Sequence, residues 1–145
     1  MFDILRDHES RILAITRILL GLMLSCHGAQ KLLGALGGAA YWGSGQDAAW
    51  IVWGAGPIEL LGGPLIAAGL FTRSASFLAS GLMAAAYFIA HAPKGFWPIL
   101  NGGELAITFC WLSLYFAAHG PGAWAIDNLR NRVAAAPTRA VVASS

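Results

Sequence analysis

Residues 50–73, WIVWGAGPIELLGGPLIAAGLFTR, form an apolar run long enough to cross a bilayer, because about 20 residues span the hydrocarbon core. One carboxylate, Glu59, lies inside this run, between Pro57 and Pro64. A charge at mid-membrane costs at least about 2.5–3.5 kcal/mol on insertion scales, so it is retained where something compensates it. Each proline removes a backbone donor and bends the helix, which opens room for a polar site. Glu59 is therefore either part of a functional site or a structural ion-pair partner between two helices.

The composition is that of a membrane protein. Of the 145 residues, 57% are hydrophobic and 11% are charged, and the mean hydropathy is +0.63. Such a chain has room for one compact domain and none for a separate soluble catalytic module. The net charge of +2 is too small to suggest nucleic-acid binding. Cys26 and Cys110 lie in apolar segments, so we expect two small hydrophobic side chains rather than a disulfide.

We expect an all-α fold, a polytopic membrane four-helix bundle. The predicted spans are residues 11–33, 50–71, 74–92 and 101–118. They define one domain, residues 1–129, and the alanine-rich residues 130–145 are predicted to form a disordered cytoplasmic tail. A competing interpretation of the first span is a cleaved, lipoprotein-like signal at Cys26, but Met23 and Leu24 suit such a site poorly.

The distribution of cations predicts the orientation. Lys31 and Lys94 fall on one side of the predicted membrane, whereas six arginines fall on the side of both termini: Arg6, Arg11, Arg73, Arg130, Arg132 and Arg139. The positive-inside rule therefore places both termini in the cytoplasm. We expect a multi-pass protein of the bacterial cytoplasmic (inner) membrane, with the lipid bilayer around its helices.

Cations and glycines share one face of the first span. At about 100° per residue this face holds Arg17, Gly21, Leu24, Gly28 and Lys31. The glycines allow a neighbouring helix to approach closely. On the second span Glu59 shares a face with Gly56 and Gly63, and these small residues again bring a neighbouring helix close to the carboxylate. The alternative is that both cations extend to the headgroups, which suits Lys31, near the helix end, better than the deeper Arg17.

Titratable residues from all four spans fall at similar depth. Glu59 lies near the middle of the bilayer, just beneath four residues of the outer half: His27, Lys31, His91 and Glu104. Two acids and one lysine are balanced only if one carboxyl group is protonated or one histidine is charged, so the cluster suits proton exchange near neutral pH. Two alternatives stay open: His91 as an ordinary interfacial histidine, and Glu104 as a favourable charge at a helix start.

These positions suggest roles. Proton chemistry is assigned to Glu59, His91 and Glu104. Ligand contacts are assigned to two residues of the cluster and to two aromatic residues on the same inward-facing stripes: His27, Lys31, Tyr87 and Trp111. No metal site is expected, because neither acid belongs to the Glu-x-x-His pair of a carboxylate-bridged di-metal centre. His27 and His91 lie at equal depth and could flank a haem, without further support from the sequence.

Several short blocks carry a family resemblance. In chain order they are Arg17-x3-Gly21, Gly28-x2-Lys31, Pro57-Ile58-Glu59-Leu60-x-Gly62-Gly63, Leu70-Phe71-Thr72-Arg73, Gly103-Glu104-Leu105-Ala106 and Gly120-Pro121-Gly122-x-Trp124-x-Ile126-Asp127. Over almost the whole chain this pattern resembles the DoxX family of small four-helix membrane proteins. The family is named for association with a terminal quinol oxidase and a thiosulfate:quinone oxidoreductase of archaea. Other members are linked to thiol redox stress or to quinone or catechol responses, so the resemblance implies the fold strongly and the function weakly.

Four classes of function fit these observations. The first is an integral membrane subunit of a quinone-linked redox system, whose cluster binds a quinone head group and moves its protons. The second is a non-catalytic pocket that binds or transports a small hydrophobic molecule. The third is a structural module that holds a partner protein, with a homo-oligomer also open, and the fourth is a haem or metal site. The first two are favoured. Oxidoreductase activity would require quinone, haem or a partner redox subunit, because no residue here transfers electrons by itself.

Overall fold

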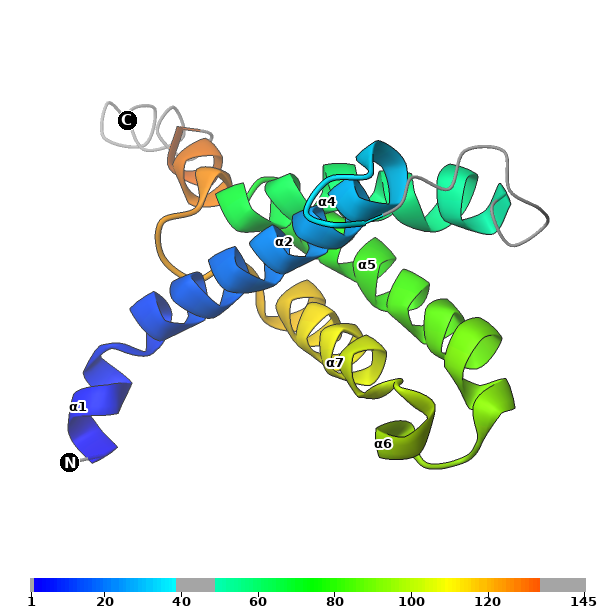
Figure 1. The fold of residues 1–145 in the computed structure, drawn as a ribbon. Coiled ribbons are helices and arrows are strands. Elements are labelled where there is room, and N and C mark those ends of the chain that lie inside the picture. The colour runs from blue at the N-terminus through cyan, green and yellow to red at the C-terminus, as the bar shows by residue number, and fades with distance from the viewer. Residues whose placement is uncertain (1, 39–48, 134–145) are drawn as a thin grey trace, which may run out of the picture.

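The computed structural model describes residues 2–38 and 49–133, and every regular element within those ranges is helical (Figure 1). The elements in chain order are α1 (Phe2–Asp7), α2 (Glu9–Leu33), η1 (Ile51–Ala55), α4 (Gly56–Ala68), α5 (Thr72–Ala86), η2 (Tyr87–His91), η3 (Ala92–Lys94), α6 (Pro98–Asn101) and α7 (Glu104–His119). A last helix covers residues 126–133. The predicted all-α class is confirmed for the described part of the chain.

Three helical stretches are long and apolar enough to cross a membrane: Glu9–Leu33, Ile51–Ala68 and Thr72–Lys94. They correspond to the first three predicted spans, as expected for a multi-pass membrane protein. The fourth predicted span, residues 101–118, corresponds to α7, which has 16 residues. That is shorter than the roughly 20 residues that usually cross a bilayer. The four-span count and the orientation of the termini therefore stay predictions.

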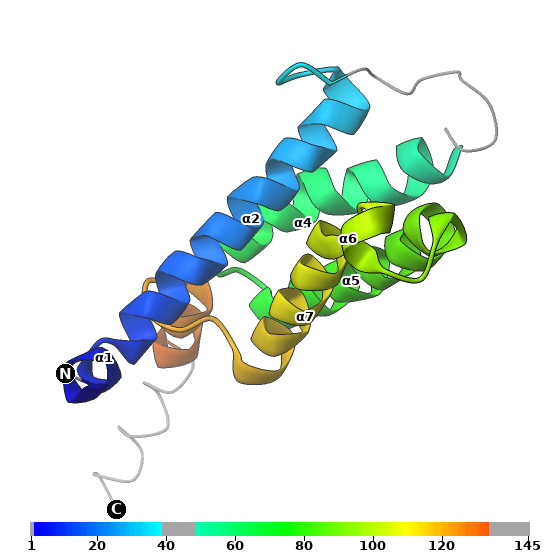
Figure 2. The same ribbon diagram turned by 60° about the horizontal axis from the view of Figure 1, so that its bottom comes forward.

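The long helices pack as two pairs (Figures 1 and 2). One pair is α2 with α4, and the other is α5 with α7, whose chains run in opposite directions. Contacts between α4 and α5 join the pairs, whereas α2 and α7 touch at few points. The buried core takes side chains from all four helices, including Leu20, Leu24, Ile66, Met83, Phe109 and Phe116. The two pairs therefore share one apolar core.

Glycines set the close contact between α2 and α4. A Cβ atom on Gly21 would lie 2.5 Å from the carbonyl oxygen of Gly63, and one on Gly28 would lie 2.4 Å from the amide nitrogen of Leu60. Only a residue without a side chain leaves the helices this close. The close approach predicted from the two glycine-bearing faces is confirmed, and it fixes how residues on the same faces meet.

The chain after α7 differs from the prediction. Residues 130–133, the first four of the predicted tail, continue the last helix, and the domain boundary at residue 129 stays a prediction. Arg130 gives the physical reason, because its guanidinium carbon lies 4.6 Å from the ring centroid of Phe71 and a guanidinium nitrogen lies 3.8 Å from the carboxylate of Asp127. Residues 134–145, the rest of the predicted tail, lie outside the described residues.

Candidate functional site

A buried ion pair joins α2 to α4. The ammonium nitrogen of Lys31 lies 2.5 Å and 2.6 Å from the two carboxylate oxygens of Glu59. Glu59 is only 3% exposed, whereas the Lys31 side chain retains 26% exposure. The glycine contacts bring the helices together, and both residues lie on the contacting faces. The compensation that the buried carboxylate requires is thus supplied directly by Lys31.

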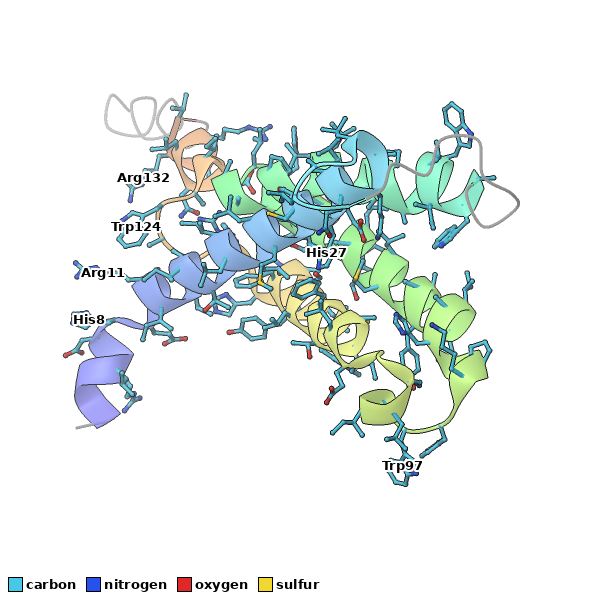
Figure 3. All side chains as sticks on the ribbon, viewed as in Figure 1. His8, Arg11, His27, Trp97, Trp124 and Arg132 are labelled. Carbon is cyan, nitrogen blue, oxygen red and sulfur yellow. The ribbon has the colours of Figure 1, made fainter. Side chains whose placement is uncertain are left out.

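The ion pair lines a cavity of about 230 Å³, here called the polar cavity. Its lining residues come from α2, α4, α5, η2 and α7 and from the loop before α7: His27, Lys31, Glu59, Met83, Ala86, His91, Gly102, Leu105, Ala106 and Phe109. His27, labelled in Figure 3, bridges the two helix pairs, because its ring meets that of Phe109 edge-on with 6.0 Å between centroids. Four residues of the predicted cluster therefore line the polar cavity: His27, Lys31, Glu59 and His91.

His91 enters this cavity from a π-helical turn, η2. Its Nδ1 lies 3.1 Å from the backbone carbonyl oxygen of Asn101. A carbonyl oxygen can only accept, so Nδ1 carries the hydrogen, and in the neutral ring Nε2 is left as the acceptor. Tyr87 stacks on the same ring, with centroids 6.4 Å apart and planes at 19°. The ring is thus held in one tautomer and one orientation. π-Helical turns of this kind are frequent at functional sites.

Asn101 is a site residue that the sequence analysis missed. It is 4% exposed, and its side chain donates to the carbonyl of Gly95 and accepts from the amide of Gly103, each at 2.8 Å. The same residue offers its own carbonyl oxygen to His91. Asparagine followed by two glycines is a turn signal. That signal was not used in predicting the span of residues 101–118, and it could have indicated an organising side chain.

Two predicted site residues lie elsewhere. Glu104 is exposed, and the Trp111 side chain is 66% exposed. Helix α7 buries a different face, which carries Ala106, Phe109, Ser113 and Phe116. The stripe assumed to face inward therefore faces outward, because an almost wholly apolar helix gives little indication of which face is buried. Tyr87 touches the site only through His91, and it is not among the residues that line the polar cavity.

Comparison with known proteins places the chain in a family. The DoxX family model matches residues 12–92, which is more than half of the chain. The chain belongs to the DoxX family. The matched segment includes the ion pair and His91. An uncharacterized protein of Haemophilus influenzae is 44% identical over 131 residues, covering 86% of this chain and 94% of that relative. No solved structure matches.

At the opposite end of the bundle, this DoxX protein buries Arg17 completely, with 0% exposure. Its Nε and its two terminal nitrogens donate to five backbone carbonyl oxygens, those of Ile66, Ala67, Pro121, Ala123 and Trp124. Five is the full donor capacity of a guanidinium group. Arg17 thus fastens α2 to the end of α4 and to the turn after α7, and the headgroup interpretation does not fit it.

The same end of the DoxX bundle carries Asp127, which caps α5. Its carboxylate accepts from the amides of Phe71 and Thr72 and from the Thr72 hydroxyl, each at 2.9 Å. Burial alone would raise the pKa of Asp127, but the hydrogen bonds from Thr72 and Phe71 and the charge of Arg130 outweigh it and hold this pKa below its usual value. A groove of about 650 Å³, here called the Asp127 groove, opens beside it, lined by Phe71, Thr72, Arg73, Ser74, Pro121, Asp127, Asn128, Arg130 and Asn131.

Proposed function

We propose that this DoxX protein is an integral membrane subunit of a quinone-linked redox system, and that its polar cavity binds the head group of a quinone or similar small hydrophobic molecule. The observation that carries the proposal is the lining of the cavity. A buried ion pair and two histidines meet Met83 and Phe109 in a space of about 230 Å³. Ligand pockets for drug-sized molecules are larger, about 300–1,000 Å³. This one suits a single ring, with any apolar tail extending between the helices into lipid.

The polar groups suit a carbonyl-bearing ring. An ammonium group has three donors, and Lys31 directs two of its hydrogen bonds to Glu59. The third donor is available to a ring carbonyl oxygen. Nε2 of His91 accepts a hydrogen bond or a proton, because Nδ1 is held by Asn101. The site therefore supplies hydrogen bonding and proton exchange, while a partner redox subunit or another cofactor supplies the electrons.

The second candidate is a non-catalytic module that binds or transports a small hydrophobic molecule. The observation that favours it is the apolar share of the lining, in which Met83, Leu105 and Phe109 are the large members. If burial of apolar surface supplies most of the affinity, ligands without a carbonyl group bind as well as quinones. A purely structural module for a partner protein binds neither.

Titration calorimetry of the protein in nanodiscs separates these functions. The ligands are a short-chain quinone and its deoxygenated analogue, and the variants are Glu59→Gln and His91→Gln. Glu104→Gln is the matched control, because Glu104 is exposed and outside the cavity lining. We expect the quinone to bind more tightly than the analogue, and each site variant to lose about tenfold, which corresponds to about one hydrogen bond. Equal affinity for both ligands would favour the non-catalytic pocket, and no saturable binding would favour the structural module.

A further inference from the structure

Hydroxyl and thiol groups follow the contact between α5 and α7. On α5 they recur at every fourth residue, Thr72, Ser76 and Ser80, and on α7 they are Cys110 and Ser113. Thr72, Ser76 and Ser113 are 0% exposed and Ser80 is 6% exposed, while Cys110 is half-buried. We call these five residues the hydroxyl seam. A spacing of four residues keeps the α5 members on one face of that helix.

Two contacts fix the register of the seam. Near one end, Arg73 donates to the carbonyl oxygens of Ala117, Ala118 and His119. Near the other, the hydroxyl oxygen of Ser80 lies 3.5 Å from the sulfur of Cys110. Between these points the helices run antiparallel (Figure 1), so Ser76 and Ser113 fall at the same level, about one turn from the Ser80–Cys110 contact.

The middle of the seam holds two unpaired hydroxyl groups. Neither Ser76 nor Ser113 finds a hydrogen-bond partner among the described residues, although both hydroxyl oxygens are fully buried. Other hydroxyls of the bundle bond the carbonyl four residues earlier, as Ser25 bonds Gly21 in α2 and Thr108 bonds Glu104 in α7. A buried hydroxyl without a partner costs about 1–3 kcal/mol. These two groups therefore need a partner, and a water molecule bonded to both hydroxyls would supply it.

The seam begins in the Asp127 groove and ends one helical turn from the polar cavity. Thr72 donates its hydroxyl to Asp127 at 2.9 Å, and both residues line the Asp127 groove. At the other end, Ser80 lies one turn from Met83 and Cys110 lies one turn from Ala106, and both of these neighbours line the polar cavity. The seam is thus a line of polar groups between α5 and α7 that begins in the groove and ends one turn from the cavity.

We propose that the hydroxyl seam, completed by water at Ser76 and Ser113, carries protons between the Asp127 groove and the polar cavity. A proton enters from bulk water in the groove and is relayed at each step, because a hydroxyl or water accepts one hydrogen and donates another. Water over the last turn brings it to the polar cavity, where Glu59 or His91 takes it and passes it out of the protein beside the Lys31 side chain, which is 26% exposed. The relay therefore ends in net flux across the membrane, and no group along the seam changes its net protonation. The alternative is that small residues only let the two helices pack closely.

Proton flux in proteoliposomes tests the seam. A potassium gradient with valinomycin drives protons inward, an enclosed pH-sensitive dye reports them, and no quinone is present, so the result is independent of ligand binding. The test variant is Ser76→Ala/Ser113→Ala, which removes two unpaired hydroxyls and should not reduce stability. The matched control is Thr108→Ala, an exposed hydroxyl on α7 outside the seam.

We expect flux above that of protein-free liposomes for the wild type and for Thr108→Ala, and the protein-free rate for the double variant. A wild-type rate equal to that of protein-free liposomes would overturn the proposal, and so would an unchanged rate in the double variant.

Infrared detection of the Cys110 S–H stretch, in a Cys26→Ala background, gives a second readout. We expect exchange to S–D in D₂O that slows in the double variant, whereas an S–H band that persists in the single Cys26→Ala protein would also overturn the proposal.

Discussion

Arg17 shows how much of this fold depends on one side chain. Its five donors meet five carbonyl oxygens, and a lysine at this position has three donors and no planar fork. Arg17→Lys loses at least two of these hydrogen bonds from a charged donor, at about 1.5–3 kcal/mol each, so we expect a loss of about 3–6 kcal/mol of stability. Thermal unfolding in detergent measures it, with Arg11→Lys, on an exposed residue of the same helix, as the control. Equal effects of the two substitutions would contradict the structural role.

The Lys31–Glu59 pair makes a second prediction for single residues. Either Glu59→Gln or Lys31→Met leaves one charge of this pair without its partner, which costs about 3–5 kcal/mol where the remaining charge is fully buried. The larger loss is expected for Lys31→Met, because it strands the carboxylate that is 3% exposed. The double variant should recover part of the loss, and a double-mutant cycle in detergent measures the recovery. Strictly additive losses would mean that the two residues do not interact.

At the residue scale, the sequence predicted those site residues that lie on helices with a clear periodic pattern of small and apolar residues. Lys31 and Glu59 each lie on a glycine-bearing face for which a close neighbouring helix was predicted, and both line the polar cavity. Glu104 was misplaced because α7 is apolar on every side, so periodicity could not distinguish its faces. Asn101 and the roles of Arg17 depend on backbone carbonyl groups brought together by tertiary packing. Every residue has a backbone carbonyl group, so residue types do not indicate which carbonyl groups a side chain will meet.

The contact between α2 and α4 gives a prediction at the scale of elements. Gly62 and Gly63 are neighbours in α4, but a Cβ atom on Gly63 would lie 2.4 Å from the hydroxyl oxygen of Ser25, whereas one on Gly62 would meet nothing within 4 Å. Gly63→Ala should therefore separate the helices and destabilise the protein, by about 1–3 kcal/mol as for other overpacked sites. Gly62→Ala should be neutral or stabilise by up to about 1 kcal/mol. Chemical unfolding in detergent compares them, and equal stabilities would exclude the close contact.

The cap on α5 gives a prediction that depends on pH. Asp127→Ala removes three hydrogen bonds at the start of the helix, for a loss of about 0.5–2 kcal/mol at neutral pH. Because the folded-state pKa of Asp127 is below its unfolded value, this contribution is complete above the unfolded pKa of about 3.9 and disappears as the pH falls through the folded pKa. Melting temperatures of wild type and variant should therefore converge below about pH 4. A gap that stays constant down to acid pH would exclude the carboxylate as its source.

Helix periodicity predicted the elements better than it predicted their irregular turns. The first three spans lie close to their predicted positions, because long apolar runs define them. The sequence predicted bends at Pro57 and Pro64. In the structure α4 continues through Pro64, and the irregularity is the π-helical turn η1, which comes before Pro57. A second such turn, η2, positions His91. Apolar periodicity, which placed the helices, does not distinguish such turns from regular α-helix.

At the scale of the whole molecule, the number of membrane crossings determines which side of the membrane each end of the bundle faces. Helix α7 has 16 residues, so length alone would allow three spans, with the C-terminus opposite the N-terminus. Its packing favours a fourth crossing, because Arg73 at the start of α5 bonds the carbonyls at the end of α7. If α5 crosses the membrane, α7 returns to the side from which α5 began. The arginine bias then places both termini in the cytoplasm.

Reporter fusions test this topology. We expect fusions at Gly37 and Gly95 to read outside, because each follows a helix that runs outward, and a fusion after residue 145 to read inside. A matched fusion after Gly69, in the turn between α4 and α5, should also read inside. A C-terminal fusion that reads outside, with Gly95 outside as well, would leave three crossings and place α7 along the outer surface. With three crossings, the Asp127 groove and the polar cavity would not lie toward opposite sides of the membrane, the groove toward the cytoplasm and the cavity in the outer leaflet. The direction of proton movement proposed for the hydroxyl seam therefore depends on this result.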